Sequence, residues 1–133
     1  MRKLIDAVSR DAETCSFVAL APEQAALLEW SPNPTLVLDC TFRIRYVNRA
    51  ALAYGQVERD ALIGQNVWEC YPSLKGSIFH QAYESVLTTR TPFRFERYDH
   101  EHDRWQLVYA FPAEGGVVAV LEDITERRRA ERS

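Results

Sequence analysis

The chain has 133 residues, 47% of them hydrophobic and 26% charged, and a net charge of -3 at pH 7. This length and composition predict one folded domain and exclude a disordered chain. The small negative charge provides no basic surface for a phosphate backbone, and no apolar stretch approaches the roughly 20 residues of a membrane-spanning helix, so we expect neither nucleic acid nor a membrane as a partner.

Two helices are predicted ahead of the first strand. Apolar residues recur at three- and four-residue spacing at Leu4, Ile5, Val8 and Ala12, which indicates a short amphipathic helix. The stretch PEQAALLEW indicates a second helix, because Pro22 suits a first helical turn and the following SPNP ends the helix.

A hairpin and a capped helix follow. TLVLD and RIRYVN have the short alternating pattern of two strands, and the connection between them, DCTF, lacks a glycine. Asn48 is predicted to cap the next helix, RAALAY, since its side-chain oxygen accepts a free backbone N–H. Gly55 is predicted to end that helix.

The middle of the chain is predicted to be a series of brief helices. VERDALIG and NVWECYP are each short helical pieces, and SIFHQAYESVLTT is a longer helix that begins at Ser77. The apolar face of this longer helix comprises Ile78, Phe79, Ala82, Tyr83, Val86 and Leu87.

Three strands complete the pattern: FRFERY, WQLVYAF and, after the turn at Gly115 and Gly116, GVVAVLE. Helices separate these strands from the first hairpin. A single five-stranded sheet of the α+β class is therefore the economical arrangement.

Two stretches, YVNRAALAYGQVERDALIGQNVWECYP and WQLVYAFPAEGGVVAVLEDITERR, together resemble a PAS domain over about Leu28 to Arg129. The resemblance implies an antiparallel sheet in the order 2-1-5-4-3, with short helices on one face around a small cavity. It divides the chain into an N-terminal helical extension (1–21), the PAS domain (22–125) and the start of a signalling helix (126–133).

The end of the last strand is predicted to pass directly into this helix. Asp123 suits the N-cap, and Glu126 suits the capping-box position from which it reaches back to the Asp123 N–H. Asp123 and Thr125 also belong to the DIT motif that carries the resemblance. The resemblance implies that this helix transmits a signal to an effector domain or partner protein beyond Ser133.

The ligand of such a module is not named by the sequence. Trp68, Tyr71, Phe79, Tyr83, Val86, Leu107 and Tyr109 are the candidates that surround a pocket for a small apolar molecule, or that fill the space themselves. The cofactor is unknown. We expect a cytoplasmic sensory module that binds a small molecule or partner.

Haem sensing is an alternative, because haem-binding PAS sensors resemble this chain in carrying a histidine on the same helix as His80. At about 100° per residue, His80 lies roughly 110° from the centre of the apolar face, which favours a boundary histidine near Glu84. A flavin-cysteinyl adduct is excluded, since Val67 occupies the position of the reactive cysteine in flavin-binding relatives. Cys70 is expected to be a small core residue.

No catalytic or metal-binding motif is identified. DHEHD, residues 99–103, carries potential metal ligands but lies where two strands turn, so we expect a solvated loop and no metal. No P-loop or Ser-His-Asp pattern is present, and we expect no enzymatic activity. Cys15, Cys40 and Cys70 are odd in number and widely spaced, which predicts no disulfide and favours a reducing compartment.

The sheet is predicted to need a cover on both faces, because the last strand has bulky apolar residues on each: Val118 and Val120 on one face, Val117 and Leu121 on the other. The N-terminal helix with Leu4, Ile5 and Val8 is the candidate cover, packed between the outer faces of two subunits in a homodimer. A ligand-free dimerisation module is accordingly a third hypothesis.

Overall fold

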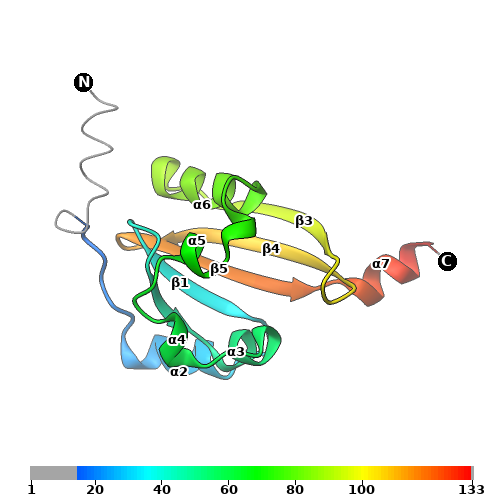
Figure 1. Ribbon diagram of the computed structural model, residues 1–133, viewed down its shortest axis with the longest axis horizontal. Helices are drawn as coiled ribbons and strands as arrows, with labels where there is room; N and C mark the ends of the chain where they lie inside the picture. The colour runs from blue at the N-terminus through cyan, green and yellow to red at the C-terminus, as the bar shows by residue number, and fades with distance from the viewer. Residues whose placement is uncertain (1–14, 133) are drawn as a thin grey trace.

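The computed structural model describes residues 15–132, so the predicted helix containing Leu4, Ile5 and Val8 lies outside the described residues. The strands form one antiparallel sheet in the order β2-β1-β5-β4-β3, which confirms the predicted topology (Figure 1). Its strands are β1 (Thr35–Asp39), β2 (Ile44–Val47), β3 (Phe93–Asp99), β4 (Arg104–Ala113) and β5 (Gly116–Asp123).

The helices fall into three groups along the chain. α2 (Pro22–Glu29) precedes the sheet, four short segments and α6 connect β2 to β3, and α7 follows β5 and projects beyond the end of the sheet (Figure 1). The segments after β2 are α3 (Arg49–Gly55), α4 (Arg59–Leu62), α5 (Val67–Cys70), the 3₁₀ turn Pro72–Leu74 and α6 (Ile78–Thr89), and the last helix is α7 (Thr125–Arg132).

The core lies between these connecting helices and one face of the sheet, here called the inner face. The sheet supplies alternate residues such as Leu38, Val108 and Val117, because successive side chains of a strand point to opposite faces. Phe79 and Val86 of α6 pack onto them. Most of the apolar face predicted for this helix therefore forms part of the core, whereas Ile78, which was assigned to that face, is 38% exposed.

The opposite, outer face carries the intervening residues of the same strands. Val37 and Val118 are paired on this face near the β4–β5 turn and are buried. Tyr109 is 37% exposed and packs against Phe111 at 5.4 Å between ring centroids. The outer face thus carries apolar side chains that are not part of the inner core.

Side-chain caps begin the helices where the sequence predicts them. Asn48 is fully buried, and its Oδ1 accepts the N–H of Ala51 at 3.0 Å, which starts α3. Ser77 accepts the N–H of Phe79 at 3.2 Å and starts α6. Gly55 is the last residue of α3, as predicted, and the left-handed residue that follows it is Gln56, with φ of 51°.

The first hairpin turns without glycine because Phe42 adopts the left-handed conformation, with φ of 65°. Its ring packs against Trp68 at 5.4 Å and against His80 at 5.7 Å between centroids. Aromatic packing thus accompanies a backbone conformation that a bulky residue rarely adopts. Asp39 supports the same turn by accepting the backbone N–H groups of Thr41 and Arg43.

A disulfide joins Cys15 to Cys40, with the Cα atoms 5.8 Å apart, so the prediction of no disulfide is wrong. The two cysteines are separated by 25 positions in the sequence, and folding brings the segment before α2 against the β1–β2 turn. The same segment donates the Val18 N–H to the Glu114 carbonyl at the β4–β5 turn. The cysteine pattern consequently gives no support for a reducing compartment.

Helix length and hydropathy bear on membrane insertion. None of the helices between residues 15 and 132 has the length and apolar content that crossing a membrane requires.

Candidate functional site

The aromatic candidates on the inner face come together as a packed cluster. Trp68, Phe79, Tyr83 and Val86 are all buried, and the rings of Trp68 and Tyr83 stack at 5.6 Å. Tyr71 lies half-buried at the edge of this cluster. Side chains therefore occupy the space at the centre of the inner face.

One polar atom in this cluster is left without a partner. The indole Nε1 of Trp68 is buried and has no hydrogen-bond acceptor among the described residues. Such an orphaned donor is uncommon in a folded protein, since burial without an acceptor costs free energy.

Two of the predicted pocket residues, Leu107 and Tyr109, lie on the opposite face of the sheet. Val108 and Ala110 of β4 belong to the inner core, so the alternating residues Leu107 and Tyr109 lie on the outer face. Their assignment to one pocket with Trp68 is wrong, because the sheet separates them from the aromatic cluster.

A cavity of about 440 Å³ opens beside α3, at the end of β5 that leads into α7. Its wall combines apolar side chains of α3 and the proline-rich segment with polar groups of β4 and β5. The lining comprises Pro32, Pro34, Ala50, Ala53, Tyr54, Arg104, Gln106, Leu121, Glu122 and Asp123. This volume falls within the range of small-molecule sites.

A hydrogen-bonded cluster closes one side of this cavity. Tyr54 donates its hydroxyl to the Asp99 carboxylate, and Gln106 donates to the Tyr54 hydroxyl at 2.6 Å. His102 Nδ1 lies 2.8 Å from the same carboxylate, and its ring stacks on Tyr54 at 4.1 Å. The cluster ties the β3–β4 hairpin to α3.

The protonation of this cluster follows from its contacts. Partial burial by itself raises the pKa of Asp99, but hydrogen bonds from Tyr54 and His102 outweigh burial and hold that pKa below its ordinary value. Burial and the neighbouring carboxylate raise the pKa of Tyr54. Tyr54 thus remains a neutral donor to an ionised Asp99.

The DHEHD segment is only partly the solvated loop that the sequence predicts, because Asp99 is buried. Asp99, Glu101 and His102 bring one ligand atom each within 4.8 Å of one another, the only such group among the described residues. Asp99 and His102 already bond to each other and to Tyr54, so these contacts explain the arrangement without an ion.

His80 lies at the boundary of the core, with 27% of its side chain exposed. Its Nδ1 accepts the Gly76 N–H at 3.0 Å, its Nε2 lies 4.0 Å from Glu84, and its ring stacks on Trp68 at 4.5 Å. These contacts place His80 at the boundary of the core near Glu84, as the helical periodicity favours, with its Nδ1 lone pair already used by the Gly76 N–H.

The position of a flavin-reactive cysteine is held by Val67, which is 1% exposed and part of the core. Cys70 is half-buried, and burial together with Glu69 raises the pKa of its thiol. A thiol of raised pKa is a poor nucleophile at neutral pH.

The junction between β5 and α7 is held by side chains of the DIT motif. Asp123 Oδ1 accepts the Thr125 N–H at 2.9 Å, and the Thr125 hydroxyl accepts the Trp105 N–H at 2.9 Å. The Ile124 N–H donates to the Trp105 carbonyl at 2.9 Å. Both backbone groups of Trp105 are thereby tied to the start of α7.

Glu126 differs from its predicted role. Its carboxylate pairs with Arg129 at 3.4 Å, where both side chains are mostly exposed. The helix begins at Thr125, so Ile124 is the residue just before it, and the Ile124 carbonyl accepts the Arg128 N–H. Asp123 caps the helix from one position further back, through the Thr125 N–H, without the reciprocal bond from Glu126.

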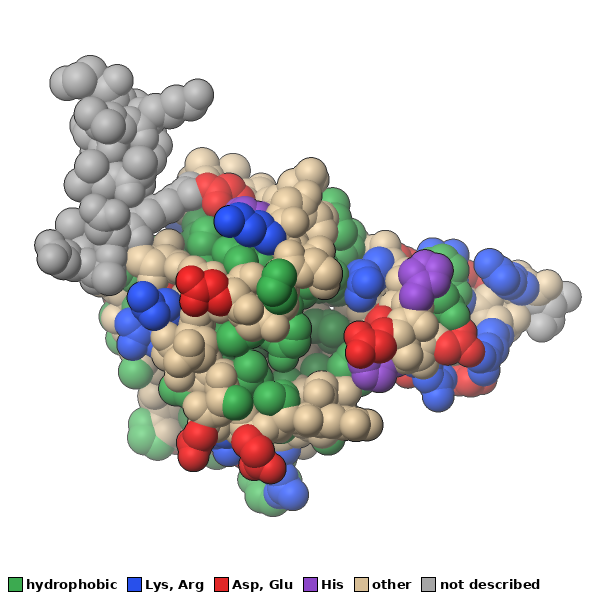
Figure 2. All heavy atoms as spheres, viewed as in Figure 1, with side chains coloured by type: hydrophobic (Ala, Val, Ile, Leu, Met, Phe, Trp, Pro, Cys, Tyr) green, Lys and Arg blue, Asp and Glu red, His purple; other side chains and the backbone are tan. Residues whose placement is uncertain are grey.

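The remainder of α7 rests on the outer face through charged contacts. Glu96 of β3 pairs with Arg127 at 3.3 Å and with Arg128 at 3.1 Å. The Arg128 guanidinium lies 4.0 Å from the centre of the Trp105 ring, within the range of a cation–π contact. Charged side chains gather over this hairpin and helix, at the right of Figure 2.

Tyr54, Asp99 and Gln106 were not identified from the sequence as site residues. The only signal for them is a polar residue at an alternating strand position, Gln106, where a hydrophobic one is expected. Their meeting depends on the pairing of β3 with β4 and on the position of α3, which no local pattern specifies.

Comparisons with known proteins agree with this architecture. A family model described as PAS fold matches residues 28–129. The PAS domain of BvgS from Bordetella pertussis is 25% identical, with a TM-score of 0.60, and the match covers 99% of this chain and 92% of that one. A search of curated proteins gives no match.

Two further solved structures share the fold at lower identity. The photoactive yellow protein domain of the sensor histidine kinase Ppr from Rhodospirillum centenum is 16% identical, with a TM-score of 0.64 over 74% of this chain and 91% of that one. A sensory box sensor histidine kinase from Vibrio cholerae is 16% identical, with a TM-score of 0.61 over 94% and 99%.

Proposed function

Since this chain belongs to the PAS-fold family, we propose that it is the sensory module of a signalling protein, which binds a small molecule in the cavity beside α3 and transmits that event through α7. One observation carries the proposal: Asp123 lines the cavity and also accepts the N–H that begins α7. A ligand in the cavity therefore contacts the residue that starts the output helix.

The free energy of one helix cap is large enough to couple ligand binding in the cavity to α7. Asp123 is shared between the Thr125 N–H and Arg104, whose Nε lies 3.6 Å from its Oδ2. A ligand group that pairs with Arg104 or displaces Asp123 changes the capping of α7, and one cap is worth about 1 kcal/mol. Allosteric coupling of about 1–3 kcal/mol is typical of regulatory proteins, so this contact is of the required size.

The lining indicates the chemical class of the ligand. Ala50, Ala53 and the two prolines favour an apolar body, while Arg104 and Gln106 favour a polar or anionic group at the β4 side. We propose a small, mainly apolar metabolite with one such group. No part of this role requires catalysis, and we propose that the module is not an enzyme.

The proposal extends to partners. α7 leaves the domain as a highly charged helix, which suits a connection to an effector domain or partner protein, like the kinases of the sensor proteins named above. The apolar outer face supports a homodimer as the working form, with Tyr109 and Phe111 among the side chains available for contact.

The test is mass spectrometry of the organic extract of the purified protein, made in parallel from two variants. Ala53→Phe fills the cavity, and Ala61→Phe adds the same ring at an exposed position of α4 outside the lining. We expect one compound to be retained by the native chain and by Ala61→Phe and lost from Ala53→Phe. Equal retention by both variants, or no retained compound and no binding in a metabolite screen, contradicts the proposal.

A further inference from the structure

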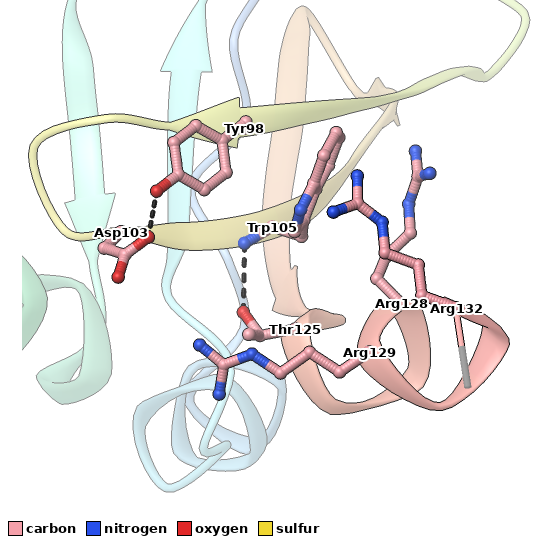
Figure 3. A pocket seen from close by; sticks show the side chains of 7 residues that line it. All are labelled: Tyr98, Asp103, Trp105, Thr125, Arg128, Arg129 and Arg132. Carbon is pink, nitrogen blue, oxygen red and sulfur yellow. Dashed lines mark hydrogen bonds between the residues drawn. The ribbon is translucent and has the colours of Figure 1, made fainter.

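A second cavity, of about 370 Å³, lies between the β3–β4 hairpin and α7. It is separate from the cavity beside α3, since the two share no lining residue. Its lining comprises Tyr98, Asp103, Trp105, Thr125, Arg128, Arg129 and Arg132 (Figure 3). Three arginines against one aspartate give this wall an excess of positive charge.

The single carboxylate in the wall is already engaged. Asp103 accepts a hydrogen bond from the Tyr98 hydroxyl. Figure 3 shows that Arg129 extends to the Asp103 side, under Thr125, whereas Arg128 and Arg132 project in the same direction beside the Trp105 ring. Arg128 and Arg132 thus form the cationic part of the cavity next to an aromatic wall.

These two arginines have donors without acceptors. The Nε of Arg128 is buried and has no hydrogen-bond partner among residues 15–132, although its Nη2 pairs with Glu96. No hydrogen bond or ion pair within the described part of the chain engages the guanidinium of Arg132, which is exposed. A buried N–H without an acceptor costs free energy, which an anionic ligand would recover.

We propose that this cavity binds a small oxyanion, a carboxylate or phosphate group carried by a diffusible metabolite. The planar guanidinium presents paired N–H donors that match both groups. Arg128 and Arg132 are four residues apart and share one side of α7, so a single anion bridges consecutive turns of the helix. Trp105 provides a flat surface for the rest of the ligand.

The position of the site gives binding a consequence for α7. Trp105 and Tyr98 belong to the sheet, and the arginines belong to the helix, so an anion held between them fastens α7 to the outer face. The neighbouring acids are Glu96, which pairs with Arg127 and Arg128, Glu126, which pairs with Arg129, and Glu131, which pairs with Arg127. None of these ion pairs includes Arg132, which makes Arg132 the informative residue to change.

The experiment is calorimetric titration of the full chain with citrate and, separately, with inorganic phosphate, at matched ionic strength. Arg132→Gln removes one cavity cation at an exposed position, and Arg127→Gln removes a cation of the same helix that does not line the cavity. We expect saturable binding, weakened about tenfold by Arg132→Gln and less than about twofold by Arg127→Gln. The indole N–H resonance of Trp105 is expected to shift during the titration.

A comparison of citrate with phosphate binding identifies the chemical group that the cavity prefers. Binding of citrate alone identifies a carboxylate ligand, binding of phosphate alone a phosphate ligand, and binding of both an oxyanion site without preference. The proposal is overturned if neither anion binds saturably up to roughly 10 mM. It is also overturned if Arg127→Gln weakens binding as much as Arg132→Gln, because the attraction then belongs to the helix as a whole.

Discussion

Asp39 is a carboxylate 1% exposed to solvent, and its contacts hold the first hairpin turn. Burial alone raises its pKa, but hydrogen bonds from Thr41, Arg43 and Arg45 outweigh burial and hold the pKa below the ordinary value of 3.8. A carboxyl group with a lowered folded-state pKa stabilises the fold above its unfolded pKa. That contribution is lost as the pH falls through the folded-state pKa.

We therefore expect Asp39→Asn to lower the free energy of unfolding at pH 7 by about 1–3 kcal/mol and to flatten its decline below about pH 4. Urea titrations at a series of pH values measure both effects. The same substitution at Asp60, an exposed residue of α4, serves as the control and should keep the native pH profile. A variant that loses stability in acid as steeply as the native chain would remove Asp39 from this role.

Asp123 gives a second prediction for a single side chain. Asp123→Ala removes the acceptor of the Thr125 N–H and should weaken the start of α7 by about 1 kcal/mol, the usual value of an N-cap. Hydrogen exchange at Glu126 to Ala130 should then accelerate before the domain unfolds. Glu122→Ala, at the preceding exposed position, is the matched control, and equal protection in the two variants would contradict the cap.

Among the larger elements, the segment before α2 is fastened by the Cys15–Cys40 disulfide. Closing a loop of this length in the unfolded chain is worth about 3 kcal/mol in the chain-entropy account. We expect Cys15→Ser to lower the free energy of unfolding by about that amount under oxidising conditions, with no effect of the same size from Cys70→Ser. Thiol counting provides the direct check: one reactive thiol in the unreduced, denatured chain supports the pair, and three exclude it.

Most helices and strands could be predicted because each leaves a local signature. Alternation marked β3 and β4, an apolar run after the turn at Gly115 and Gly116 marked β5, and the side-chain oxygens of Asn48 and Ser77 marked helix starts. Alternation also shows which strand residues share a face, but it does not show which face the helices cover. Leu107 and Tyr109 were assigned to the wrong side for that reason.

Contacts between distant segments left no such signature. Cys15 meets Cys40 only because the N-terminal segment crosses the first hairpin turn, and Tyr54 meets Asp99 only because α3 lies against the β3–β4 hairpin. Glu126 has the capping-box spacing from Asp123, yet α7 begins at Thr125, so Glu126 is the second residue of the helix and its carboxylate pairs with Arg129. Spacing alone does not decide at which residue a helix begins.

For the molecule as a whole, we expect a two-fold homodimer in which the segment with Leu4, Ile5 and Val8, which the sequence predicts to be a helix and which lies outside the described residues, packs between the outer sheet faces. Burial of an aliphatic side chain contributes about 1.5–3 kcal/mol, so a few of them offset the entropy of association. Light scattering at micromolar concentration compares the full chain with a version that starts at Pro22. A monomeric full chain, or a truncated chain that stays dimeric, contradicts this role of the segment.

The sheet order also determines how the domain responds to mechanical force. β5 is the central strand, paired with β1 on one side and β4 on the other, and α7 continues from its end. Tension applied through α7 pulls β5 along its own axis, roughly perpendicular to the hydrogen bonds on both sides. These bonds are loaded together in shear, so an effector joined to α7 can pull or twist the helix without peeling a strand from the sheet.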